Sequence, residues 1–137
     1  MSAKTKIEAD IDYQKLERHY VDIASKLVTA AAQETRNVAV TSIQRGPKSG
    51  KTYVKYKPRR VHTASSPYQP PASDTGRLAS SIHLVVNDKL DNDVSTDIKY
   101  AAPLEFGTRN MAPRPFLKPA ADKGKEKLNK LMKRLIR

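Results

Sequence analysis

The chain of 137 residues contains no cysteine and no tryptophan, and only 6% of its residues are aromatic. The absence of cysteine excludes disulfide bonds, cysteine-ligated zinc sites and thiol catalysis. The longest apolar stretch, residues 27–32, is far shorter than the roughly 20 residues that a transmembrane helix needs. The first ten residues lack the apolar segment of a secretory signal, so none is expected. The sequence therefore predicts a soluble single domain over residues 1–137.

Acidic residues are scarce relative to basic ones, and the excess of basic residues is unevenly distributed. The formal net charge is +12, from 26 Lys and Arg against 14 Asp and Glu. Residues 46–63, here called the basic arm, carry +6 with no acid; residues 84–107 carry −3 and residues 108–137 carry +8. This asymmetry predicts contact with a polyanion or docking between complementary surfaces, without choosing between them. The cations of the arm are Lys48, Lys51, Lys55, Lys57, Arg59 and Arg60.

Two segments have the periodicity of amphipathic helices. Asp10 and Asp12 are both suitable N-caps for a long helix that begins near Tyr13, and Gly46–Pro47 would end it. Pro119 suits the first turn of a lysine-rich C-terminal helix. The apolar stripe of the first helix is Tyr13, Leu16, Tyr20, Ile23, Leu27 and Ala31. The stripe of the C-terminal helix is Leu117, Ala121, Gly124, Leu128, Leu131 and Leu135.

The segment between these helices reads as a mixture of strands and loops. Residues 48–63 predict a protruding, irregular hairpin, and the proline-rich residues 65–71 predict an extended chain. Asp74 and Thr75 are placed to cap a short helix over residues 76–82. Residues 82–86 and 94–100 predict an antiparallel strand pair joined by an Asp- and Asn-rich turn. The order of elements predicts an α+β fold.

None of the motifs that carry catalysis is complete. Residues 46–52 (GPKSGKT) have three residues between the glycines where a phosphate-binding P-loop needs four. Ser80, Ser81 and His83 show no nucleophile elbow, and the carboxylates between residues 88 and 97 lack the pattern of a calcium loop. We therefore expect no catalytic, cofactor-binding or metal site, and an enzyme is the least favoured class.

Two basic segments allow alternative interpretations. The arm, with Tyr53 and Tyr56 between its cations, suits stacking on nucleic acid, and it equally suits a solvated loop or a contact between subunits. The C-terminal helix has a lysine face and an apolar stripe that would suit an anionic membrane, but the narrow stripe favours core packing.

Three segments together resemble a known family. They are residues 66–82 (SPYQPPASDTGRLASSI), residues 100–108 (YAAPLEFGT) and residues 111–120 (MAPRPFLKPA). In this order and spacing they are similar to the tail-component, or neck, family of long-tailed bacteriophages. That family joins head to tail and is similar in role to the tail-completion protein Z of phage lambda. The basic arm departs from the family pattern, which leaves its role open.

The resemblance implies a non-catalytic virion protein, assembled in the host cytoplasm, that forms part of a ring between the capsid portal and the tail tube. Its implied partners are other copies of itself, with a hexamer as one option, and neighbouring neck, head-closure and tail-terminator or tail-tube proteins. DNA in the channel is a further implied partner, whereas a membrane and a cofactor are not. The motif residues implied to be structural or interfacial are Asp74, Thr75, Gly76, Arg77, Leu78, Tyr100, Glu105, Phe106, Gly107, Thr108, Arg114, Pro115, Phe116 and Leu117.

These motif residues carry physical expectations of their own. Phe106 and Phe116 are expected to be buried anchors, and Gly107 to adopt a backbone state closed to residues with side chains. Glu105 is expected to need a cationic partner, with Arg77 and Arg114 as the candidates. Packing within a monomer would explain the same residues. The alternative function is a small basic nucleic-acid-binding protein that uses the arm and the C-terminal helix.

Overall fold

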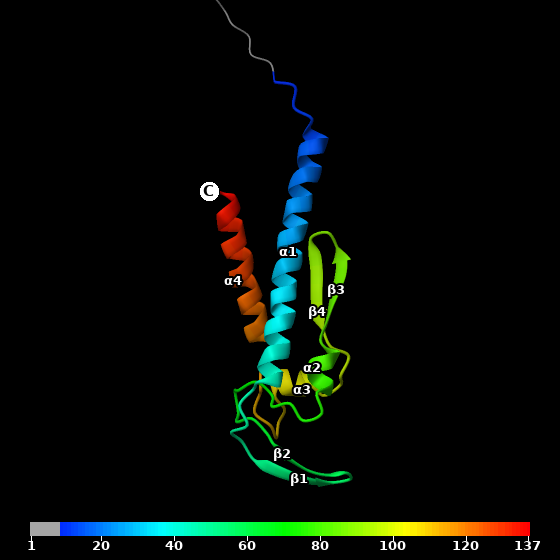
Figure 1. Cartoon of the computed structure of the whole chain (residues 1–137), viewed down its shortest axis with the longest axis vertical. Coiled ribbons are helices and arrows are strands. Elements are labelled where there is room, and N and C mark those ends of the chain that lie inside the picture. The colour runs from blue at the N-terminus through cyan, green and yellow to red at the C-terminus, as the bar shows by residue number, and fades with distance from the viewer. Residues whose placement is uncertain (1–8) are drawn as a thin grey trace, which may run out of the picture.

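The fold is organised around one long helix. The computed structural model describes residues 9–137, so the first eight residues of the predicted domain lie outside the described part. In chain order the helices and strands are α1 (Tyr13–Gln44), β1 (Thr52–Tyr56), β2 (Arg59–Thr63), α2 (Arg77–Ser81), β3 (His83–Asp88), β4 (Asp91–Ser95), α3 (Ala101–Phe106) and α4 (Leu117–Leu135). In Figure 1, α4 lies along one side of α1 and the β3–β4 hairpin along the other. The predicted α+β fold is confirmed.

The ends of α1 follow from local chemistry. The side chain of Asp12, rather than that of Asp10, caps the helix by accepting a hydrogen bond of 2.9 Å from the backbone N–H of Lys15. The helix ends at Gln44, and the N–H of Arg45 still donates to the carbonyl of Thr41. Gly46 and Pro47 follow directly, so both predicted boundaries are confirmed.

The strands form two separate antiparallel pairs. In the β3–β4 hairpin the turn is shorter than predicted, because Asp91 already pairs with Asp88 and Asn92 with Val86. The second strand therefore begins at Asp91 instead of Val94 and ends at Ser95. β1 and β2 pair from Thr52↔Thr63 to Tyr56↔Arg59 and form the predicted arm, which projects beyond the end of α1 (Figure 1).

The core lies at the lower end of α1, where the short helices and α4 converge (Figure 1). α1 and α4 approach closely at Gly124, where an added Cβ would lie only 2.9 Å from the carbonyl oxygen of Ala31. Side chains of both helices line one groove there, so the stripe of α4 faces α1 from Leu117 to Leu128, as the core-packing interpretation predicted, whereas Leu135 at the end of the stripe is 57% exposed. The buried apolar residues are Ala39, Ile43, Leu78, Ala79, Ile82, Ala101, Phe116 and Ala120.

The N-terminal part of α1 carries apolar side chains that the described part of the chain leaves exposed. Figure 1 shows this part of the helix rising above the ends of α4 and of the β3–β4 hairpin. Tyr13 is 73% exposed and Tyr20 62% exposed, with Leu16 between them also exposed. The lower part of the predicted stripe, Ile23, Leu27 and Ala31, is half-buried, and the buried residues of α1 are Ala39 and Ile43, which the predicted stripe did not include. We call Tyr13, Leu16 and Tyr20 the open stripe.

Candidate functional site

The basic arm is a hairpin whose two sides are joined at its base by backbone hydrogen bonds. The N–H of Gly50 donates to the carbonyl of Ala64, and the N–H of Ala64 donates to the carbonyl of Lys51. Beyond this base every residue of β1 is exposed, including Tyr53 and Tyr56. Four exposed arm cations form no ion pair with any residue from 9 to 137: Lys48, Lys51, Lys57 and Arg59.

Asp74 holds the arm and does not cap α2, so the predicted capping role is wrong. Its carboxylate accepts a hydrogen bond from Nζ of Lys55 and one of 3.1 Å from Nη2 of Arg60, and Nδ1 of His62 lies 3.8 Å away. The hydrogen bond from Lys55 is the main cause that lowers the pKa of Asp74. Burial opposes this shift, while the charges of Arg60, Lys55 and His62 reinforce it. Two of the six arm cations are thus paired within the chain.

α2 begins without any side-chain cap, because the residue at its N-cap, Gly76, has no side chain; its backbone is left-handed (φ 78°). Thr75 and Arg77 are exposed, and Leu78 is buried in the core. The guanidinium of Arg77 forms no ion pair within residues 9–137. The motif around Gly76 therefore buries Leu78 and leaves Arg77 outside.

Glu105 binds the start of α4, and the predicted cationic partner is wrong. It is the last but one residue of α3 and is 8% exposed. Its Oε2 accepts from the backbone N–H groups of Phe116 (2.8 Å) and Leu117 (3.0 Å), and its Oε1 accepts from that of Lys118 (2.8 Å). These are the N–H groups that a helix leaves unsatisfied at its N-terminus. Backbone amides, not an arginine, compensate the buried charge.

The two phenylalanines have opposite environments. Phe116 is 1% exposed and is the largest fully buried side chain, as predicted. Phe106 is 81% exposed, so its prediction as a buried anchor is wrong. α3 explains the difference: with Ala101 and Glu105 on its buried side, the adjacent position 106 faces outward.

A tight turn connects α3 to the segment before α4. Gly107 has φ 77° and ψ 176°, and an added Cβ would lie 2.9 Å from the carbonyl oxygen of Met111, which confirms the predicted special backbone state. The N–H of Thr108 closes the turn by donating to that same carbonyl at 2.8 Å. Pro115 is half-buried between this turn and Phe116.

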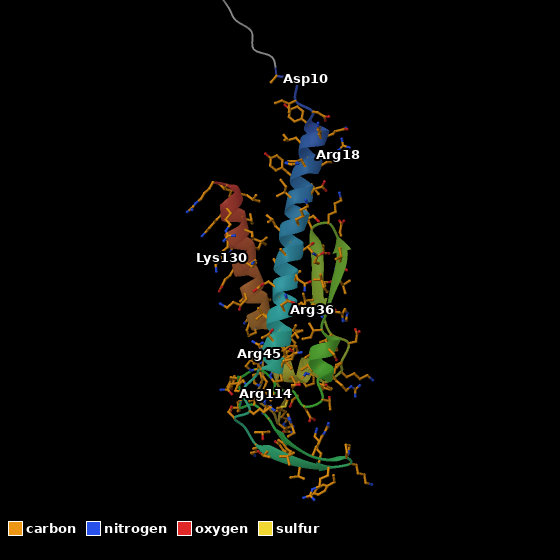
Figure 2. All side chains as sticks on the ribbon, in the orientation of Figure 1. Asp10, Arg18, Arg36, Arg45, Arg114 and Lys130 are labelled. Carbon is orange, nitrogen blue, oxygen red and sulfur yellow. The ribbon has the colours of Figure 1, made fainter. Side chains whose placement is uncertain are left out.

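Hydrogen bonds of Arg114 and Tyr68 together join the three segments that carry the family resemblance. Its N–H donates to the carbonyl of Leu104, and its Nε donates to the carbonyl of Ser65 at 3.3 Å. The N–H of Tyr68 donates to the carbonyl of Pro113. Figure 2 shows Arg45 and Arg114 near the lower end of α1, above the arm, with Arg18 on the upper part of α1 and Lys130 on α4. The sequence motifs thus meet in one place.

An open cleft of about 550 Å³ lies between the arm and the body. We call it the arm cleft. It is lined by Lys55, Arg60 and His62 from the arm and by Asp74, Arg77, Tyr100 and Arg114 from the body. Ser65 also lines it; no sequence motif indicates a role for this residue, because its burial depends on how the arm folds back.

The serine and histidine residues near β3 form a structural pair. Nε2 of His83 lies 3.2 Å from Oγ of Ser95, its partner across the β3–β4 ladder, and Nδ1 lies 2.9 Å from the carbonyl oxygen of Ser81. Neither the arm cleft nor the groove between α1 and α4 is lined by His83. This pair therefore links the two strands.

Further searches for known features gave three results. Within residues 9–137, no cluster of three or more His, Asp or Glu side chains is arranged to hold a metal ion. No helix in the same range is long and apolar enough to cross a membrane. Comparison with known proteins gave no match to a family model, to a curated protein or to a solved structure.

Proposed function

We propose that this chain is a structural subunit of a bacteriophage neck, which assembles with copies of itself into a ring and joins head to tail. The observation that carries the proposal is the open stripe on α1. Tyr13 and Tyr20 are large apolar side chains that project from an elongated subunit with a small core (Figure 1). Exposed apolar surface of this kind marks a site of protein contact.

The motif residues support the same function. The segments that resemble the neck family meet through Glu105 and the backbone of Phe116, and through Tyr68 and Pro113. They build the joint from which α1 and the arm extend in opposite directions (Figure 1). Such a subunit has contact surfaces at both ends, which a head-to-tail ring requires. The virion neck is accordingly the proposed location.

The direct test is genetic. Deleting the gene from the phage that encodes it should yield DNA-filled heads and separate, completed tails, and a plasmid copy should restore joined particles. Gold-labelled antibody against the chain should bind at the head–tail junction of intact virions. Normal infectious particles formed without the chain would contradict the proposal.

A second candidate function, nucleic-acid binding, is favoured by the exposure of Tyr53 and Tyr56 among arm cations that form no ion pair with residues 9–137. Changing Lys48, Lys51, Lys57 and Arg59 to Gln tests it, because no described residue pairs with these side chains and the free energy of unfolding should change by less than about 1 kcal/mol. If the arm binds DNA, affinity for any duplex falls, and the salt dependence flattens by roughly one unit of slope for each lost phosphate contact. We expect instead that assembly is impaired while the weak affinity for DNA changes little.

A further inference from the structure

The arm cleft combines a cationic lining with apolar side chains. Four Lys and Arg residues line it against a single carboxylate, that of Asp74, which leaves a formal excess of three positive charges. Its apolar and aromatic lining includes Ile43, Tyr53, Leu78, Tyr100 and Leu104. A volume of about 550 Å³ is enough for several side chains. A ligand for such a cleft carries negative charge together with an apolar group.

Two buried polar groups of the cleft have no partner. Ser65 is 1% exposed, and its Oγ makes no hydrogen bond within the described part of the chain. Nε of Arg60 is likewise buried and unpaired there. A buried donor without an acceptor costs free energy that an incoming oxygen recovers. Both groups therefore favour occupation of the cleft by a carboxylate.

The tip of the β3–β4 hairpin has the complementary chemistry. Asp88 and Asp91 are both exposed and face one another as register partners, and Asp93 follows. Like charges directly opposite each other in a strand pair are destabilising, so the fold of the monomer gains nothing from this pair. Leu90, between the two carboxylates, is 52% exposed. The tip thus presents an apolar side chain between two carboxylates, while the cation of its other turn residue, Lys89, lies 3.5 Å from Asp22.

The tip cannot enter the cleft of its own chain. It is held against the middle of α1, where Nζ of Lys89 lies 3.5 Å from Asp22 and Nδ2 of Asn92 donates to Oγ1 of Thr29. The cleft lies beside Ile43, which is 21 residues beyond Asp22, or about 30 Å along the helix axis. Figure 1 shows the tip directed away from the arm.

We propose that the arm cleft of one copy receives the tip of the β3–β4 hairpin of a second copy, with Leu90 entering the apolar part and Asp88 and Asp91 meeting the cations of the rim. This inference rests on the proposed self-assembly of the chain and names the surfaces that meet. The two surfaces differ, so the contact is heterologous and propagates from copy to copy until it closes a ring.

A charge-reversal cycle on the full chain tests the contact. Arg77→Glu reverses an exposed and unpaired cation of the cleft, and Asp91→Lys replaces one member of a like-charged pair, so both variants should fold. Each should lower the association constant, measured by sedimentation, about tenfold or more because like charges then meet. The combined variant should recover most of this loss, since the two charges are exchanged.

Matched controls lie outside both surfaces. Lys130→Glu and Asp122→Lys make the same charge changes on exposed positions of α4, and association should stay within about twofold of the wild type. Circular dichroism checks the fold, and Arg77→Gln replaces Arg77→Glu if the latter does not fold.

The outcomes separate this contact from the proposed function. A ring that persists in every reversal variant overturns the contact and leaves ring assembly standing. A wild-type chain that stays monomeric overturns both. If Arg77→Glu reduces affinity for duplex DNA while self-association is unchanged, the cleft binds phosphates and the proposed contact is wrong.

Discussion

The carboxylate of Glu105 at the end of α3 accepts a hydrogen bond of 2.8 Å from the backbone N–H of Phe116 at the start of α4. It also binds the next two N–H groups, those of Leu117 and Lys118. One buried side chain therefore positions α4 relative to α3, over a separation of 11 residues in sequence. Removing the Glu105 side chain would leave three backbone N–H groups without their acceptor.

Replacing Glu105 by Ala should lower the free energy of unfolding by about 2–4 kcal/mol, because three N–H groups lose a charged acceptor in a buried place. Chemical denaturation measures this. Glu105→Gln retains one amide oxygen and should lose less. If Glu105 instead depended on a cationic partner, Arg77→Ala or Arg114→Ala would be equally damaging. An Ala variant of Glu105 with wild-type stability would contradict the capping role.

The two phenylalanines provide a matched pair of variants. Phe116→Ala should cost about 3–5 kcal/mol of unfolding free energy because it opens a cavity in the core. Phe106→Ala removes a side chain that is 81% exposed and should change stability by less than about 0.5 kcal/mol. If Phe116→Ala does not fold, Phe116→Leu gives a smaller loss that remains measurable. An equal loss of stability in Phe116→Ala and Phe106→Ala would contradict the buried position of Phe116 and the exposed position of Phe106.

The two glycines with positive φ differ in how strongly their surroundings and backbone conformation exclude a side chain. Gly107, at φ 77° and ψ 176°, occupies a region that is essentially restricted to glycine, and a Cβ there would meet Met111 and Pro113. Gly76 has a similar φ, but no atom lies within 4 Å of an added Cβ. Gly107→Asn should therefore cost about 3 kcal/mol or more, and Gly76→Asn about 1 kcal/mol or less. Thermal unfolding of both variants tests this order, which a comparable loss at Gly76 would contradict.

The attachment of the arm by Asp74 should depend on pH and salt. The folded state lowers the pKa of Asp74 below its ordinary value of 3.8, so its contribution to stability is complete above that value and is lost as the pH falls through the lowered pKa. Asp74→Asn should therefore increase hydrogen exchange of the arm amides at pH 7, and the difference from the wild type should vanish at strongly acidic pH. The side chain is 23% exposed, so high salt should also reduce the difference. A difference that persists at all pH values would contradict the pairing.

Much of the fold could be predicted from local patterns. The cap at Asp12, the stop before Gly46 and the stripe of α4 depend on residues close in sequence, and the structure agrees with them. α3 was missed because Pro103 lies within it, although proline is tolerated in the first turn of a helix.

The errors at the candidate site share one physical cause. By its position in the sequence, Asp74 could accept hydrogen bonds either from the amides of α2 or from the cations of the arm. It binds Lys55 and Arg60 because the folded arm brings these two side chains to it. Glu105 binds amides that its sequence neighbourhood does not reveal. The local pattern around Phe106 has apolar character without showing which side of α3 is covered. Such contacts between distant segments need three-dimensional information.

The most direct measurement of the central claim is native mass spectrometry of the full chain, combined with electron microscopy of the same sample. The subunit mass is 15.3 kDa. We predict one closed complex, at a fixed multiple of that mass, which does not grow with concentration and appears as a ring. A chain that remains at 15.3 kDa at millimolar concentration, or that forms open filaments of unlimited length, would contradict it.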